Sequence, residues 1–163
     1  MTWGSLLRAL TLAAALLWTT SSLAEVPQQQ LPRLLHTAWG QDTSAPPSIW
    51  DIGQSPQGDL WLATGAGLYR FDGVRFSQFR SDGRTTLPSE MVVAMLVTRS
   101  GDIWVGYHPG GVALIRDGQI AHYAGGLPKG TVKQIVQGQD GAVWVATFGG
   151  VAVLREGQWK PVA

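Results

Sequence analysis

Hydrophobic and polar positions along the chain follow one pattern that occurs three times between residues 48 and 163. Each copy has two apolar residues three positions apart, a Gly-x-x-Trp group, and then an aliphatic and a small residue. A Gly-aliphatic pair and an acidic-Gly pair follow at nearly constant distances in all three copies. The tryptophans of the pattern are Trp61, Trp104 and Trp144. Self-similarity at this period indicates a protein built from structural repeats.

Each copy predicts four short strands. The first is rich in β-forming residues, and the second is a near-continuous apolar run, as in LWLAT, IWVGY and VWVAT, which is typical of a strand covered on both faces. A Gly-rich turn leads to a third strand, and an acidic-Gly pair predicts a hairpin to the fourth. Four strands in 40 to 43 residues are typical of a β-propeller blade. The sequence therefore predicts an all-β fold of about three four-stranded antiparallel blades, with repeats at approximately 48–79, 91–123 and 131–163.

The repeated tryptophans and glycines have a structural interpretation. A blade packs on a neighbour through each face, so its inner strands must be apolar, and one Trp per blade supplies a large buried area. The small residue two positions after each Trp is expected to make room where blades converge. Glycine permits the tight reversals between strands. We expect packing and turn roles here rather than contact with a ligand.

The first 24 residues are predicted to be a secretory signal peptide. Arg8 precedes a ten-residue apolar stretch, and the segment ends in a small-x-small sequence at Ser22-Leu23-Ala24. The apolar stretch is short for a membrane span, so cleavage is favoured over an uncleaved anchor. Residues 25–33 are expected to be a flexible lead-in, and 34–163 a partial propeller. Export without cysteines suits a bacterial periplasm.

Composition and charge exclude several classes of protein. Only 14% of residues are charged and 21 are glycine, which argues against a disordered chain and against a helical bundle. The formal net charge of +1 gives no basic surface for phosphates, so a nucleic-acid partner is not expected. With no cysteine, the chain has neither a thiol nucleophile nor a cysteine-based zinc site.

The repeat resembles that of the two-component regulator propeller family, roughly I-x-x-I-x-x-D-x-x-G-x-L-W-x-G-T-x-x-G-L. The matching segments are 49–68, 92–112 and 132–151, and the LYRFDG sequence at 68–73 is similar to a turn of that family. His36-Thr37-Ala38-Trp39 is similar to its opening strand. The second repeat departs from the pattern at Tyr107-His108-Pro109, and TSAPPS at 43–48 replaces the first Leu-Pro-Ser. The resemblance covers about residues 31–163.

This resemblance implies a sensory function. Members of the family place a periplasmic propeller before a membrane span and a cytoplasmic histidine kinase, diguanylate cyclase or DNA-binding regulator. The chain would then be a non-catalytic input module, with an unknown small molecule or carbohydrate as ligand. The alternative is a fragment of a secreted propeller enzyme, such as a lyase or glycosidase, or of a carbohydrate-binding lectin.

The number of repeats raises the question of how the fold closes. Propellers contain about four to eight blades, and three would leave two apolar faces bare. In closed propellers an unaccompanied opening strand, here His36–Trp39, completes the last blade. We expect a truncated N-terminal piece, a split gene or a chain that closes by self-association, and truncation is favoured.

Candidate chemistry outside the repeat framework is sparse. The histidines lack metal-ligand spacing, and the recurring aspartates are expected to bond their own backbone at turns rather than to act in catalysis or bind Ca²⁺. These residues are His36, His108 and His122, and Asp42, Asp51, Asp59, Asp102 and Asp140. We therefore assign no catalytic, cofactor-binding or metal-binding residue and expect no cofactor. If a sugar binds at one mouth of the propeller, Trp50 or Tyr107 could stack on it, although core packing is the favoured role for Trp50.

Overall fold

The computed structural model describes residues 37–40, 44–80, 87–123 and 125–162. The predicted signal peptide at 1–24 and the lead-in at 25–33 lie outside these residues, as do His36 and Asp42. All of the described strands belong to the compact unit that begins at Ala38.

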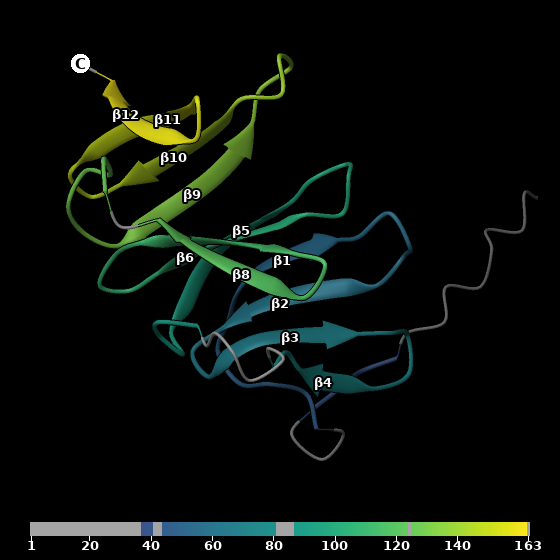
Figure 1. The fold of residues 1–163 in the computed structure, drawn as a ribbon. Coiled ribbons are helices and arrows are strands. Elements are labelled where there is room, and N and C mark those ends of the chain that lie inside the picture. Colours follow the sequence, from purple (N-terminus) through teal and green to yellow (C-terminus); the bar gives the residue numbers. More distant parts are fainter. Residues whose placement is uncertain (1–36, 41–43, 81–86, 124, 163) are drawn as a thin grey trace, which may run out of the picture. The chain divides into compact units, whose positions relative to one another are not determined.

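The described residues form an all-β structure of three four-stranded antiparallel sheets, which confirms the predicted secondary-structure class (Figure 1). In each sheet the strands are ordered as they follow in the chain. The first sheet contains β1 (Ile49–Gln54), β2 (Leu60–Thr64), β3 (Gly67–Phe71) and β4 (Phe76–Gln78). The second contains β5 (Val92–Val97), β6 (Ile103–Tyr107), β7 (Val112–Arg116) and β8 (Gln119–Tyr123). The third contains β9 (Val132–Gln137), β10 (Val143–Thr147), β11 (Gly150–Arg155) and β12 (Gln158–Val162).

The acidic-Gly pairs form the predicted hairpins between third and fourth strands. Asp117-Gly118 has φ values of 51° and 76°, and Glu156-Gly157 has 54° and 73°. Two successive positive φ values are the signature of a type I′ turn, which matches the twist of the strands it joins. In the first sheet the Asp72 carboxylate instead accepts hydrogen bonds from the backbone N–H groups of Val74, at 2.9 Å, and Arg75, at 2.8 Å.

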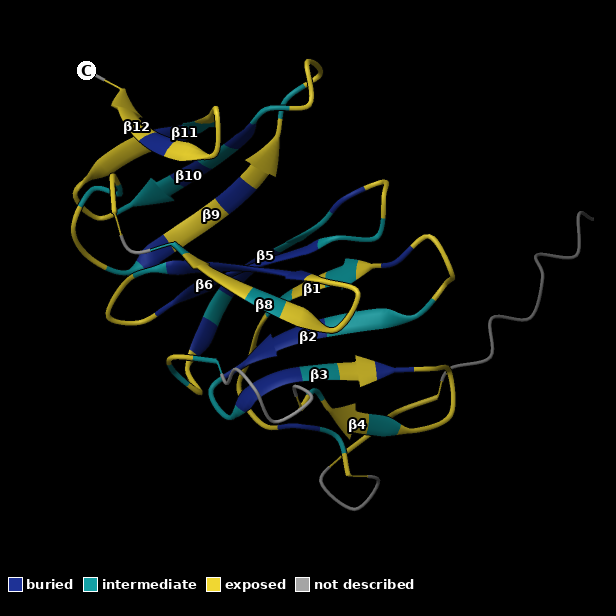
Figure 2. Ribbon diagram, viewed as in Figure 1, coloured by how far each residue is buried: buried dark blue, intermediate teal, exposed yellow. Residues whose placement is uncertain are grey.

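Neighbouring sheets pack face to face through two hydrophobic clusters. One joins the first and second sheets through residues that include Ala63, Leu68, Val92, Met95, Val105 and Ala113. The other joins the second and third sheets through residues that include Trp104, Val112, Leu114, Val132, Ile135 and Trp159. The second sheet is covered on both faces, and its strand β6 is buried along its full length (Figure 2).

The repeated tryptophans have unequal environments. Trp104 is buried against the third sheet, where its ring centroid lies 5.7 Å from that of Trp159. Trp61 and Trp144 are partly exposed. The packing role predicted for the repeated Trp is thus most complete in the central sheet, where the Trp104 ring also lies against that of Tyr123.

The predicted opening strand is not formed by the residues of it that the structure describes. Ala38 and Trp39 belong to no strand. Trp39 packs its ring edge-on against Phe71 of β3, with a centroid separation of 4.9 Å. A strand is defined by backbone pairing with a neighbour, and here aromatic packing holds the segment instead.

Candidate functional site

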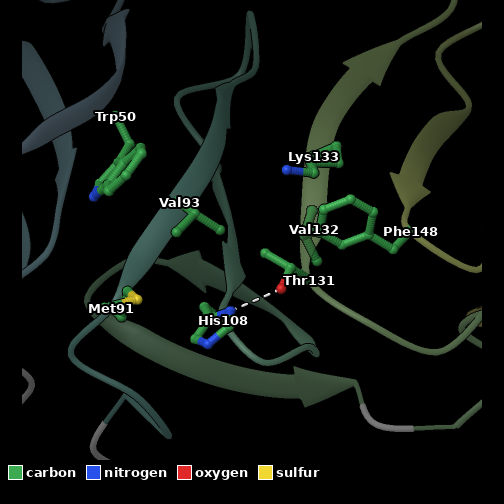
Figure 3. Close-up of a pocket in the computed structure, with 8 residues that line it drawn as sticks. All are labelled: Trp50, Met91, Val93, His108, Thr131, Val132, Lys133 and Phe148. Carbon is green, nitrogen blue, oxygen red and sulfur yellow. Dashed lines mark hydrogen bonds between the residues drawn. The ribbon is translucent and has the colours of Figure 1, made fainter.

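A pocket of about 420 Å³ lies where the first strands of the three sheets meet. It is built from equivalent positions of the repeat. Trp50, Val93 and Lys133 each stand second in the first strand of their sheet, at β1, β5 and β9. Figure 3 shows these residues with the rest of the lining, which is Met91, His108, Thr131, Val132 and Phe148.

Trp50 is a pocket residue, so the core role favoured for it is wrong. Its side chain is 60% exposed. In all three first strands the pairing register shifts at this second residue, so Trp50, Val93 and Lys133 have no partner on the neighbouring strand. A bulge of this kind interrupts the alternation of side chains and turns the extra residue in a new direction. The indole therefore presents its faces at the pocket rather than to a neighbouring sheet (Figure 3).

His108 is fixed by contacts on both sides of the pocket. Its Nδ1 lies 2.8 Å from the Thr131 hydroxyl oxygen, which joins the loop after β6 to the residue before β9. Its backbone N–H donates to the Met91 carbonyl at 3.2 Å, and its own carbonyl accepts from the Ser89 hydroxyl at 3.1 Å. Anchoring at these points gives the exposed imidazole a defined direction toward the pocket.

Phe148 occupies the same repeat position as His108, one residue after the second strand. Its backbone N–H donates to the Thr131 carbonyl at 3.2 Å. The Lys133 ammonium lies 4.0 Å from the centroid of the Phe148 ring, within the range of a cation–π interaction. A second aromatic face and a positive charge thus stand beside the imidazole and hydroxyl.

Tyr107 does not reach the pocket, so it cannot stack on a sugar there. The residue is fully buried at the end of β6, in the cluster between the first and second sheets. Burial raises the pKa of its hydroxyl above the ordinary value. Its exposed neighbour His108 is the residue that the unusual Tyr-His-Pro sequence presents to the pocket.

The recurring aspartates make ion pairs and inter-sheet contacts as well as local backbone bonds. Asp102 receives two hydrogen bonds from the Arg116 guanidinium, at 2.6 and 2.9 Å, and these lower the pKa of its carboxyl. Asp59 pairs with Arg70 at 2.8 Å. The expectation that these two aspartates bond mainly to their own backbone is therefore wrong, because an arginine on the third strand of the same sheet lies within reach.

The two remaining aspartates are closer to the expectation. Asp51 accepts a hydrogen bond from the N–H of Ile52 at 2.8 Å, but its other oxygen accepts from Met95 of the second sheet, also at 2.8 Å. Asp140 accepts from the N–H of Ala142 at 3.1 Å. His122 lies in β8, away from the pocket. Among the residues that the structure describes, no three His, Cys, Asp or Glu side chains are grouped to hold a metal ion.

The pocket combines two exposed aromatic side chains with an imidazole, a hydroxyl and an ammonium group. Apolar faces of this kind contact the apolar side of a ligand, and a few polar groups fix its orientation. The sequence reasoning named only Trp50 and His108 among these residues. One feature of the sequence could have indicated the others. Trp50, Val93 and Lys133 occupy the same position of the repeat but differ in chemistry, whereas the framework residues around them are alike in all three copies.

No family model matches the chain, and no curated protein is significantly similar to it. Several solved structures share its fold. The extracellular domain of a hybrid two-component system from B. thetaiotaomicron matches with a TM-score of 0.60 and 22% identity, over 69% of this chain and 16% of that one. Virginiamycin B lyase from Staphylococcus aureus matches with a TM-score of 0.55 and 16% identity, over 72% and 40% of the two chains.

These similarities confirm the fold class, since the three sheets match propeller proteins. At such identities the likeness concerns the fold alone. The chain spans less than half the length of either protein. Within the described part of the chain, no helix has the length and apolar character needed to cross a membrane.

Proposed function

We propose that this chain is the ligand-binding, non-catalytic input part of a bacterial sensor of the two-component regulator propeller family, that it works in the periplasm, and that its ligand is a carbohydrate. The observation that carries the proposal is the pocket at the meeting point of the first strands, whose lining includes the exposed rings of Trp50 and Phe148 and the imidazole of His108.

The chemistry of the lining favours a saccharide. A sugar ring has an apolar face of C–H groups that stacks on an aromatic side chain, and hydroxyl groups at its edge that exchange hydrogen bonds. Trp50 and Phe148 offer the aromatic faces. His108 and Lys133 offer polar groups within the same pocket. A large amphipathic aromatic side chain exposed to solvent is typical of binding surfaces.

The residue types also favour binding over reaction. Glycoside hydrolysis ordinarily uses two carboxylates on either side of the scissile bond. The polar side chains at this pocket are instead an imidazole, a hydroxyl and an ammonium group, and the imidazole is held by the Thr131 hydroxyl. Such a set suits recognition of a neutral or acidic sugar.

A sensory role is supported by two observations. The repeat pattern at 49–68, 92–112 and 132–151 is similar to that of sensor propellers, and the fold matches the extracellular domain of a two-component system. That domain is about six times longer than the part matched, so the signalling output belongs to a longer protein in this proposal.

Isothermal titration calorimetry of the full chain with lactose, maltose and xylobiose tests the proposal. We expect at least one to bind with a Kd between about 10 µM and 1 mM, and Trp50→Ala to weaken it at least about tenfold by removing the stacking surface. Trp39→Ala is the matched control, because Trp39 is also an exposed tryptophan but lies outside the pocket. The proposal would be contradicted if Trp50→Ala bound the saccharide as tightly as the parent chain does, or if none of the three saccharides bound.

His108 supports a second candidate, a propeller enzyme. An exposed imidazole fixed by a hydrogen bond can act as a general base or acid. NMR of each saccharide incubated with the chain separates the candidates. The binding module leaves the sugar unchanged. Turnover that disappears in His108→Ala would make the chain an enzyme and exclude the non-catalytic proposal.

A further inference from the structure

The two interfaces between sheets are built in the same way. In each, two apolar residues of a first strand lie against a face that carries the repeated Trp, the small residue after it and the first aliphatic residue after the Gly-rich turn. We call the two first-strand residues the inserting edge. We call the face of the neighbouring sheet against which they lie the receiving face. The inserting edges are Ile49 and Ile52, Val92 and Met95, and Val132 and Ile135. The receiving faces are Trp61, Ala63 and Leu68; Trp104, Gly106 and Val112; and Trp144, Ala146 and Val151.

Exposure separates the occupied copies of this interface from the open ones. On the inserting edges Met95 and Ile135 are 5% and 4% exposed, whereas Ile52 is 57% exposed. On the receiving faces Leu68 and Val112 are 0% and 2% exposed, whereas Val151 is 40% exposed. Among the described residues, the inserting edge of the first sheet therefore has no receiving face against it. The receiving face of the third sheet likewise has no inserting edge against it.

The open receiving face of the third sheet contains a cavity at the place where the occupied receiving faces are filled by side chains of an inserting edge. A cavity of about 230 Å³ lies on the third sheet, lined by Gln134, Val136, Trp144, Val145, Ala146 and Val151. At the equivalent place on the second sheet, a Cβ added to Gly106 would lie 2.6 Å from the Cβ of Val132. On the second sheet, Val132 of the third sheet's inserting edge thus fills the space next to Gly106. The equivalent space next to Ala146 on the third sheet is the cavity.

We propose that this cavity receives the inserting edge of a second copy of the chain, formed by its Ile49 and Ile52. The chemistry of the occupant is set by the two filled interfaces, which take aliphatic or thioether side chains at these two positions. Ile52 is the same residue type as Ile135, and Ile49 differs from Val132 by one methylene group. A formal net charge of +1 per chain gives little repulsion between copies.

The contact is heterologous, because an edge on one copy meets a different surface on the other. Such contacts form closed rings when the rotation between copies closes, and open filaments otherwise. Two copies would bring together six of the described sheets, within the range of about four to eight found in closed propellers, and three copies would exceed that range. The expected assembly is therefore a closed dimer with two identical interfaces. It does not depend on the carbohydrate proposal, because neither the open inserting edge nor the open receiving face contributes a residue to the pocket of Trp50 and His108.

Light scattering of the purified full chain at about 50 µM tests the proposal, and the expected mass is twice that of the monomer. Ile52→Lys alters only the inserting edge and Val151→Glu alters only the receiving face, so each variant alone should have the monomer mass. An equimolar mixture of the two should regain the dimer mass, because the unaltered edge of one variant meets the unaltered face of the other. Val74→Lys, an equally drastic change at an exposed valine in the β3–β4 hairpin, should leave the dimer intact.

Each outcome decides the question. A monomeric parent chain would overturn the proposal. A dimer that survives both Ile52→Lys and Val151→Glu would show that a different surface joins the copies, and a mass that grows without limit with concentration would exclude the closed ring. If a charged variant fails to fold by circular dichroism, Ile52→Ala and Val151→Ala serve instead, each raising the dimer dissociation constant at least about tenfold.

Discussion

At the scale of single residues, Asp102 and Arg116 form the shortest ion pair among the described residues. The Asp102 side chain is 16% exposed, and the arginine forms two hydrogen bonds to it. A planar guanidinium matches a carboxylate in this geometry, which makes the bonds stronger than those of a single contact. The pair links the turn before β6 to the end of β7 and so ties two neighbouring strands of the central sheet.

This pair predicts a pH dependence of stability. The pKa of Asp102 is lowered in the folded chain from its ordinary value of 3.8 by the hydrogen bonds from Arg116. The pair therefore contributes stability that is fully present above that ordinary value and lost as the pH falls through the lower folded pKa. Asp102→Asn should cost between a few tenths and about 1 kcal/mol at pH 7, and its difference from the parent chain should shrink as the pH falls below 3.8.

Urea unfolding from pH 2 to pH 7 measures the effect. Asp140→Asn is the control, because its pair with Arg155 is longer, at 3.6 Å, and more exposed, so the loss at pH 7 should be smaller. An Asp102→Asn variant as stable as the parent chain at every pH would contradict the prediction.

At the scale of elements, the spacing between sheets depends on the small residue after each Trp. β6 and β9 approach so closely at Gly106 that a methyl group there would collide with Val132. The small-residue rule read from the sequence thus describes a real constraint. It is strictest in the second sheet, which has Gly where the other two have Ala63 and Ala146.

Gly106→Ala should therefore destabilise the chain by about 1 to 3 kcal/mol, the usual cost of overpacking a filled core. Thermal or urea unfolding measures the change. Gly125→Ala is the matched control, since a Cβ there meets nothing within 4 Å, and its stability should be nearly unchanged. Equal stability of the two variants would show that the sheets can separate without cost.

At the scale of the whole described unit, burial is greatest in the middle sheet. β6 is buried throughout and β7 nearly so, whereas β1 and β12 are largely exposed. Backbone amides open to exchange with free energies that follow such differences in packing. Hydrogen exchange followed by mass spectrometry should therefore find the slowest amides in β6 and β7 and faster ones in β1 and β12. The reverse order, or uniform exchange, would contradict this description of the core.

The strands and sheets could be predicted from the sequence because the framework residues recur with their local chemistry. Gly-x-x-Trp and the acidic-Gly pairs specify strand ends and hairpins without knowledge of the rest of the chain. The environment of Trp50 could not be predicted in this way. Its exposure follows from where it lies relative to the other first strands, and this is a property of the packed sheets. Lys133 and Phe148 were missed for the same reason, since neither belongs to the recurring framework.

The construction of the pocket has a consequence for how its selectivity can evolve. Duplication of a blade supplies a new copy of each pocket position together with its scaffold, and the copies then mutate independently. Codons 50, 93 and 133 already encode an indole, an isopropyl group and an ammonium group at one repeat position. Descendants of such a gene can exchange these three codons, or a laboratory can randomise them, while the Trp and Gly framework stays unchanged. Related chains with the same framework are therefore expected to differ most in ligand preference at these three codons.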